Sequence, residues 1–461
     1  MQKKDDKNTA NKNHKTACLY GDETAKSLAN FTISELKMPR AFLWALGTIK
    51  SASAQANQAL GLLDSDKSLA IQLAAKEVAD GFHDNQFPID VFQTGSGTST
   101  NMNANEVIAS LVKLTSNQTI SVHPNDDVNM GQSSNDVIPS CIHLSAAKLI
   151  AEQLLPSLEH LRNTLDDKAS EHHGTIKTGR THLMDAMPLS FAQEISAWSA
   201  QVNYAYDQLQ NNLPSLYKLA IGGTAVGTGV NTHPNFAAMV TRTLTEKTGL
   251  TFTPADNYFR AISAQDTAVC ISGILKTTAV SLSKISNDIR WLSSGPLNGL
   301  NEIRLPELQK GSSIMPGKVN PVIPEAVLMA CTQVIGNDTT ITLAGQSGNF
   351  QLNTMLPLIA HTLVQSIQLL SSSANALADK VVKEISVNHD EIEKNLSRNP
   401  ILATALTKLI GYEKSAEIAK KAYAEKRTVI DVAIELTNIS AVELTAHLDP
   451  KRLIGGINET E

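Results

Sequence analysis

Apolar residues recur every three or four positions in the central third of the chain, which is the spacing of one face of an α-helix. One series consists of Phe191, Ile195, Trp198, Val202, Ala205 and Leu209. A second consists of Ile271, Leu275, Thr278, Leu282, Ile285, Ile289 and Leu292. A third, Leu154, Leu158, Leu161 and Leu165, includes Pro156, which predicts a kink. These patterns predict long helices packed side by side in a bundle.

Residues 339–378 contain no Asp, Glu, Lys or Arg. Apolar residues at helical spacing (Ile359, Leu363, Ile367 and Leu370) alternate there with Ser, Thr, Gln and Asn. Polar residues are too frequent for a membrane span, so no membrane contact is expected. The pattern fits a helix covered on most sides by other helices. That much coverage predicts subunit contacts, and therefore an oligomer.

The chain divides into three predicted domains, with boundaries near Gly131 and Asn388. Residues 1–131 mix short helices with polar loops, and residues 132–388 hold the long helices. Residues 389–461 carry short amphipathic stretches such as Ser415–Tyr423 and Val429–Leu436. We expect residues 1–14, which are polar, to form a disordered tail.

Composition narrows the class of protein. Aromatic residues make up 4% of the chain and charged residues 18%, while Ala, Leu, Ser and Thr are abundant, which favours a mainly α fold. A net charge of −6 provides no basic face for nucleic acid, and an anionic substrate would have to be attracted by local groups. The polar N-terminus lacks the apolar region of a signal peptide, so we expect a cytoplasmic protein.

The four cysteines, Cys18, Cys141, Cys270 and Cys331, are far apart in the sequence. Such spacing offers neither a zinc site nor an iron–sulfur ligand run. We therefore expect reduced, mostly buried thiols and no metal.

The segment Gly311-Ser-Ser-Ile-Met-Pro-Gly-Lys-Val-Asn-Pro321 is the richest in chemistry. Glycines and prolines mark it as a loop, and it holds two adjacent hydroxyls, a cation and an amide. Such groups suit binding of a carboxylate beside a hydroxyl that moves a proton.

Four further segments carry hydroxyls and amides on glycine-containing or polar loops. They are residues 93–106 (QTGSGTSTNMNANE), 123–136 (HPNDDVNMGQSSND), 178–183 (TGRTHL) and 222–233 (GGTAVGTGVNTH). Removing a proton from the carbon next to a carboxylate builds negative charge on that carboxylate, so several donors must converge on it. The candidate donors are Ser96, Thr98, Ser133, Ser134, Asn135, Thr181, Lys318 and Asn320.

These segments, in this order, resemble the conserved regions of the fumarase/aspartase superfamily, and most closely its class II, iron-independent fumarases. The resemblance covers the chain from about Leu19 to its end. It implies a mainly α, three-domain fold with five long central helices per chain. It also implies a homotetramer with a twenty-helix core, active sites shared between three chains, and no metal or organic cofactor.

The resemblance also assigns roles. Ser312 matches the base that takes the carbon-bound proton, and His182 matches a histidine that pairs with Glu325 to activate or deliver water. Lys318 and Asn320 match substrate-binding residues. His123, Asn125 and Asp126 match a second anion site, although Thr119–Val122 stand where enteric members carry an arginine. Because Pro-Asn-Asp is also ordinary turn chemistry, the second site has a simpler explanation.

Three activities remain open. The first is fumarate hydratase, which interconverts fumarate and (S)-malate through an aci-carboxylate intermediate. The second is aspartate ammonia-lyase, and the third is a structural protein that reuses the fold. His182 and Ser134 favour the first over the second, whereas Leu305–Gln309 does not discriminate. The intact set of Ser312, Lys318, Asn320 and His182 argues against a structural protein.

Overall fold

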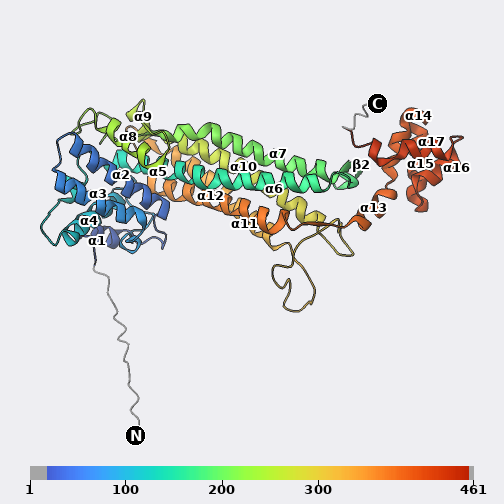
Figure 1. The fold of residues 1–461 in the computed structure, drawn as a ribbon, viewed down its shortest axis with the longest axis horizontal. Helices are drawn as coiled ribbons and strands as arrows, with labels where there is room; N and C mark the ends of the chain where they lie inside the picture. The colour runs from blue at the N-terminus through green and yellow to red at the C-terminus, as the bar shows by residue number, and fades with distance from the viewer. Residues whose placement is uncertain (1–17, 456–461) are drawn as a thin grey trace, which may run out of the picture. The chain divides into compact units, whose positions relative to one another are not determined.

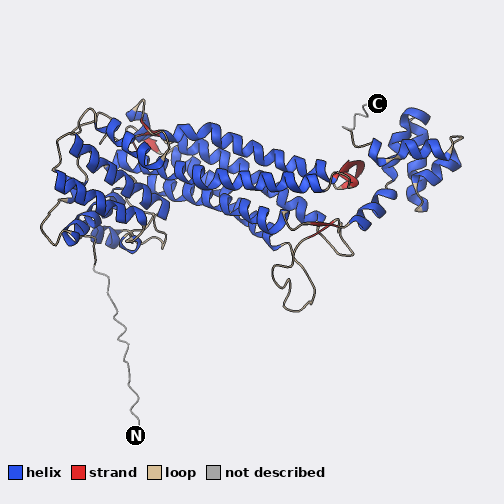
Figure 2. Cartoon of the chain, in the orientation of Figure 1, coloured by secondary structure: helices blue, strands red, loops and turns tan. Residues whose placement is uncertain are grey.

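The computed structural model describes residues 18–455, so the predicted tail at residues 1–14 lies outside the described residues. Helices make up most of the described chain, and the few strands are short (Figures 1 and 2). The mainly α fold expected from composition is confirmed. The chain separates into two compact units, each of three segments. Four of the five boundaries between these segments fall within helices α5, α10, α11 and α12, and the fifth falls within the short 3-10 helix Leu213–Tyr217.

The first unit contains the described residues of Met1–Ala146, together with Leu216–Ala268 and Leu343–Val364. Its helices are α1 (Asp22–Asn30), α2 (Arg40–Ala59), α3 (Ser65–Asp80), α4 (Thr98–Thr115), α8 (Phe236–Thr248), α9 (Tyr258–Ser263) and most of α5 (Ser134–Leu149). Its two-residue strands pair as β3 (Lys218–Leu219) with β4 (Thr253–Pro254), in parallel, and β6 (Gly348–Asn349) with β7 (Leu352–Asn353), antiparallel.

The second unit contains Ala147–Ser215, Val269–Thr342 and the described residues of Gln365–Glu461. Its long helices are α6 (Leu155–Glu171), α7 (Phe191–Asn212) and most of α10 (Asp266–Leu292), α11 (Val322–Gly345) and α12 (Leu356–Leu377). Its strands are β1 (Ile176–Thr181), β2 (Met184–Ser190), β5 (Ile303–Arg304) and β8 (Ser386–Val387). Its last helices are α13 (His389–Ser397), α14 (Thr407–Ile410), α15 (Tyr412–Glu425), α16 (Val429–Leu436) and α17 (Ala441–Leu448).

The two long apolar series lie on α7 and α10, and every member of both is buried. Local hydrogen bonds explain where α7 begins. Ser190 caps α7 by accepting from the Gln193 amide, and the Gln193 side chain accepts in return from the Ser190 amide. The helix predictions are therefore confirmed. By length and composition, α10 is the one helix of the described chain that could cross a membrane, a property that buried core helices share.

A π-helical turn, Ile150–Leu154, joins α5 to α6 immediately before Pro156. Proline has no amide hydrogen to donate back into the preceding turn, which favours such a local change of helical winding. The irregularity predicted from Pro156 is thus present. Leu154, Leu158, Leu161 and Leu165 remain on one buried face across it.

Residues 339–378 differ from the single helix expected. They contain the end of α11, the β6–β7 hairpin and then α12. Gly345, Gly348 and Asn353 break the helical pattern, and the Asn353 side chain donates to the carbonyl oxygens of Ala344 and Gly345. Ile359, Leu363, Ile367 and Leu370 are fully buried within the chain itself. Their burial therefore needs no second subunit.

The last residues form a separate small core. Leu406, Ile418, Val432 and Leu444 pack together there with residues of α15, α16 and α17. Helix α13 begins at His389, where the third predicted domain starts. The three-domain division itself stays a prediction, because the two compact units divide the chain differently.

Candidate active site

Within the first unit, the 93–106 segment places its hydroxyls at the start of α4. Gly97 caps this helix with a left-handed backbone (φ 74°), and a β-carbon there would lie 2.9 Å from Ile138 Cγ1. A side chain is therefore excluded at this position, which holds Ser96 and Thr98 in a fixed turn. Their hydroxyl oxygens lie 2.7 Å apart. One hydroxyl donates to the other, which leaves the proton of the second hydroxyl free for a ligand.

Ser133, Ser134 and Asn135 lie at the start of α5, also within the first unit. Ser134 Oγ accepts a hydrogen bond from Asn101 Nδ2 of α4 (3.1 Å). Asn135 Nδ2 donates to the Ala225 carbonyl oxygen (2.8 Å), which lies in the predicted 222–233 loop. The 123–136 segment is thus held against both other polar loops of this unit.

Asp136 holds the start of α5 against the 222–233 loop. Its buried carboxylate accepts from the backbone amides of Ser133 (2.9 Å), Gly222 (3.0 Å) and Thr224 (2.8 Å). Burial raises the pKa of Asp136 to about 6, although these three hydrogen bonds act to lower it. The carboxylate is therefore a structural anchor for two candidate loops rather than a group facing a ligand.

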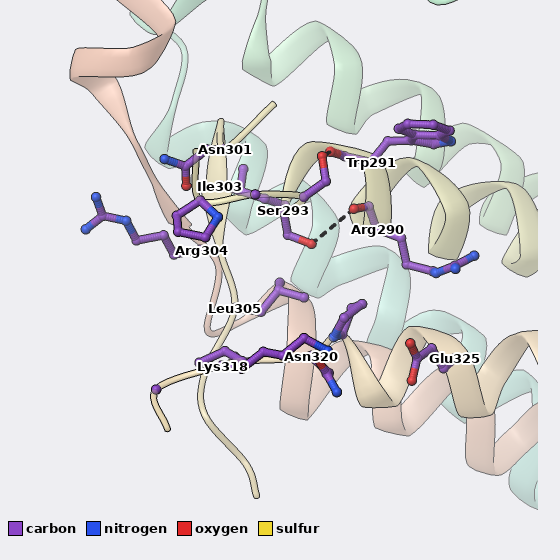
Figure 3. Close-up of a pocket in the computed structure, with 16 residues that line it drawn as sticks. Arg290, Trp291, Ser293, Asn301, Ile303, Arg304, Leu305, Lys318, Asn320 and Glu325 are labelled. Atoms are coloured by element: carbon purple, nitrogen blue, oxygen red, sulfur yellow. Dashed lines mark hydrogen bonds between the residues drawn. The ribbon is translucent and has the colours of Figure 1, made fainter. Parts of the chain in front are cut away.

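Within the second unit, a cavity of about 650 Å³ lies beside the Gly311–Pro321 segment (Figure 3). Three of the predicted residues, Lys318, Asn320 and Glu325, line it, and so do Arg290 and Arg304. The charged lining therefore consists of three cations and one carboxylate. This local excess of positive charge suits an anionic ligand on a chain whose net charge is −6.

The Gly311–Pro321 segment is folded back on itself. Asn320 Nδ2 donates to the Gly311 carbonyl oxygen (2.6 Å), and a β-carbon on Gly311 would lie 1.9 Å from the Lys318 carbonyl oxygen. Only glycine fits this close approach. Ser312 does not line the cavity, but its Oγ accepts from the amides of Ile314 (3.2 Å) and Met315 (3.1 Å).

Thr181 and His182 lie at the turn of the antiparallel β1–β2 hairpin, where Thr181 pairs with Met184. His182 and Leu183 both have positive φ (55° and 60°), the backbone of a tight two-residue turn. Non-glycine residues adopt this conformation at a cost that often accompanies function. The turn leaves His182 exposed.

His182 and Glu325 are not joined within the chain. Glu325 is exposed at the first turn of α11, and among residues 18–455 its carboxylate makes no hydrogen bond or ion pair. The His182 ring likewise has no hydrogen-bond partner in the described chain. Both predicted members of the pair are therefore available to other groups.

A buried ion cluster supports the His182 hairpin. Glu302, 1% exposed, lies 2.5 Å from Arg180 and 2.6 Å from Lys177, and Glu194 also contacts Lys177 (2.7 Å). Lys177 and Arg180 belong to β1, while Glu302 directly precedes β5, whose two residues line the cavity. One carboxylate thus connects the hairpin to the cavity wall.

The second anion segment is an ordinary capped turn. His123 caps a π-helical turn, Pro124–Val128, because its Nδ1 accepts from the Asp126 amide (3.2 Å). The Asp126 carboxylate lies 3.1 Å from the same ring nitrogen, and Asn125 is exposed. The Nδ1 atom of the imidazole is therefore already engaged within the chain.

Several residues of these networks were not predicted from the sequence, above all Lys50, Asn101, Lys177 and Glu302. Their partners are far away in sequence, so no local spacing marks them. The one available signal was Lys50, which stands within a run of otherwise apolar and small residues, 41–54.

Potential metal ligands and free thiols bear on whether the site could hold a metal ion. Among residues 18–455, no three His, Cys, Asp or Glu side chains cluster in a way that could hold a metal ion. The four cysteines are free; Cys141 and Cys331 are buried, while Cys18 and Cys270 are exposed. The expectation that the thiols are mostly buried is therefore correct for two of them only.

The known proteins that this chain is similar to belong to the superfamily that its motifs indicate. The family described as "Lyase" matches residues 11–336, and the family described as "Fumarase C C-terminus" matches residues 402–455. A protein of Xylella fastidiosa (strain Temecula1) named fumarate hydratase class II is 53% identical over 95% of this chain and 93% of its own length. A Pseudomonas aeruginosa protein named fumarate hydratase class II 2 is also 53% identical, over 95% of both chains.

A solved structure gives the same result for the fold. The crystal structure of recombinant class II fumarase from Schistosoma mansoni superposes with a TM-score of 0.91 at 40% sequence identity, and the match covers 95% of each chain.

Proposed function

We infer that this chain, which belongs to the class II fumarate hydratase family, catalyses the reversible hydration of fumarate to (S)-malate. The observation that carries this conclusion is identity of 53% over nearly the whole length of relatives that bear this name. The chain is a lyase of the fumarase family, as its motifs predicted. We place the reaction in the cytoplasm.

We further propose that Ser312 takes the proton from the carbon next to a carboxylate. A serine hydroxyl is a weak base, so its alkoxide must be stabilised. The amides of Ile314 and Met315 point at Ser312 Oγ and supply such stabilisation. The negative charge that develops on the substrate as an aci-carboxylate would be held by Lys318 and Asn320 from the same segment.

Water is added or removed at the neighbouring carbon, and we assign this step to His182 with Glu325. A carboxylate partner orients an imidazole and raises its basicity. Because both side chains are exposed and unpaired within the chain, we propose that they meet between subunits. Ser96, Thr98, Ser133, Ser134, Asn135 and Thr181 would complete the substrate contacts in such a shared site.

This assembly is proposed to be a homotetramer with each site formed by three chains. The face of α11 supports it. Met329 (69% exposed), Leu343 (55%) and Ile335 (37%) are large apolar side chains uncovered in the single chain. Leu328, Met329, Thr332, Gln333 and Gly336 also line a hollow of about 370 Å³ along that helix. A helix that is apolar on its buried and exposed sides alike is typical of a bundle core shared between subunits.

His123, Asn125 and Asp126 are proposed as a second anion site that takes no part in the chemistry. Their exposure permits contact with an anion. Because His123 already caps its own turn, we expect binding there to be weak.

The leaving group provides the decisive test. Purified protein should convert malate to fumarate, followed by the ultraviolet absorbance of fumarate, and should leave aspartate essentially unchanged. A chelator should not reduce the rate. Faster production of fumarate from aspartate would replace this proposal with aspartate ammonia-lyase, and no reaction with either substrate would favour a structural protein.

A further inference from the structure

Lys50 of α2 is a buried cation without a counter-ion at hydrogen-bond distance. Its side chain is 0% exposed, and no carboxylate of residues 18–455 forms an ion pair with it. Its ammonium instead donates to two neutral amide oxygens, Asn129 Oδ1 (2.8 Å) and Gln132 Oε1 (3.0 Å). Burying a charge without a counter-ion destabilises the folded protein, so this lysine is expected to have a role beyond packing.

Both amide partners connect Lys50 to the proposed substrate loop, Ser133–Asn135. Gln132 precedes Ser133 in the chain, and Asn129 Nδ2 donates to the Gln132 carbonyl oxygen (3.2 Å). Asn129 Oδ1 also accepts from Asn101 Nδ2 (3.2 Å), and the same amide nitrogen donates to Ser134 Oγ (3.1 Å). One hydrogen-bonded network therefore joins the Lys50 ammonium to the Ser134 hydroxyl.

The pKa of Lys50 lies near neutral pH. Burial lowers the pKa of Lys50 to about 7, although the Cys141 thiol and the Asp136 carboxylate of α5 act to raise it. Cys141 and Asp136 are the two titratable groups that act on Lys50. The other side chains of this hydrogen-bonded network, Asn101, Asn129 and Gln132, are uncharged. Asp136 is itself engaged by three backbone amides.

We propose that Lys50 is a positioning residue that holds the Ser133–Asn135 loop for the substrate and places a positive charge behind it. This inference rests on the proposed role of that loop in binding a dicarboxylate. A purely structural residue would not need the charge, because an apolar side chain of similar length would avoid the desolvation cost. A dianionic substrate, by contrast, is stabilised by a nearby charge in a medium of low dielectric constant.

The test uses succinate, a saturated dicarboxylate that cannot react, and measures its dissociation constant by calorimetry on the full-length protein. For Lys50→Met, we expect affinity at pH 6.5 to fall roughly tenfold, equivalent to about 1.4 kcal/mol. The ratio of the variant and wild-type dissociation constants should decrease between pH 6.5 and 8.5, because wild-type Lys50, with a pKa of about 7, loses its charge over that interval. Groups that titrate independently of Lys50 affect both proteins equally and cancel in the ratio.

Lys168→Met is the matched control, since Lys168 is also buried (7% exposed) but pairs with Glu171 on α6. Its succinate affinity should equal that of the wild type. Unchanged affinity in Lys50→Met, or a ratio that does not vary with pH, would overturn the proposal. Should Lys50→Met not melt cooperatively, Gln132→Met, which removes one acceptor of the ammonium, takes its place, and unchanged binding in that variant has the same meaning.

Ser134→Ala separates failure of this inference from failure of the proposed site. If Ser134→Ala weakens succinate binding and Lys50→Met does not, Lys50 has no positioning role and the loop remains the substrate site. If neither variant changes binding, the loop itself is not the site, and the inference fails with it.

Discussion

At the scale of single residues, the proposed chemistry depends on two side chains of ordinarily low reactivity. Ser312 Oγ accepts two backbone amides, an arrangement that favours a negatively charged oxygen over a neutral hydroxyl. His182 is exposed on a strained turn and makes no hydrogen bond within the described chain. Neither contributes to a hydrophobic core, so their replacement should affect turnover far more than folding.

Ser312→Ala and His182→Asn should each lower malate turnover by roughly two to four orders of magnitude, the range typical for loss of a general acid or base. Steady-state kinetics with purified variants would measure this, and circular dichroism melts should remain close to wild type. His123→Asn is the control, because its site is not assigned any chemistry, and it should retain most activity. Turnover near that of the wild type in Ser312→Ala would remove the serine from the mechanism.

The loops that carry these residues can be recognised in the sequence, but the groups that hold those loops in place cannot. Ser312, Lys318 and Asn320 lie within one eleven-residue segment, so their order alone was informative. The network that holds Ser134 joins Lys50, Asn101 and Asn129, which come from two helices and a loop. Such contacts depend on how the helices pack, and no pattern in a single sequence determines them.

At the scale of elements, the two-stranded β1–β2 hairpin pairs with no further strand of the described chain, and a buried ion cluster connects it to Glu302. Lys177, fully buried, and Arg180, largely buried, both contact Glu302, which lies outside the hairpin. Removing one partner of a buried ion cluster leaves the others uncompensated, which costs more than the cluster contributes. The hairpin presents Thr181 and His182, so its position also affects the proposed site.

Glu302→Gln should therefore destabilise the protein by roughly 3–5 kcal/mol, because two buried cations lose their shared carboxylate. Glu194→Gln should cost less, about 1 kcal/mol, since Glu194 is 25% exposed and Lys177 retains Glu302. Melting temperatures at equal protein concentration would rank the two variants. Malate turnover should fall in Glu302→Gln and persist in Glu194→Gln, whereas equal effects on both measurements would show that Glu302 has no special relation to the hairpin.

The sequence predicted the long helices well and the short elements poorly. The series on α7 and α10 repeat over many turns, so their burial follows from periodicity alone. The β1–β2 hairpin was not predicted, since its turn residues, His182 and Leu183, are not the usual Asn or Gly. The absence of charge in residues 339–378 predicts one helix, and it does not reveal the break at residues 345–353.

At the scale of the whole molecule, assembly has to be tested on residues that the single chain leaves uncovered. Ile367 is unsuitable, although the sequence suggested it, because it is already fully buried within one chain. A charge there would disrupt that chain's own packing whether or not subunits associate. Met329 on α11 is 69% exposed and apolar, so a charge at this position is harmless to an isolated chain and costly in a subunit interface.

Met329→Glu should dissociate the proposed tetramer and abolish malate turnover together, because His182 and Glu325 would then have no partner chain. Light scattering during size-exclusion chromatography, with activity assayed on the same fractions, would measure both properties. Val442→Glu is the matched control: Val442 is 82% exposed on α17, which belongs to the separate C-terminal core, and this variant should keep both its size and its activity. A Met329→Glu monomer with full activity would show that one chain forms a complete site, and would overturn the shared-site proposal while leaving the assignment to the family intact.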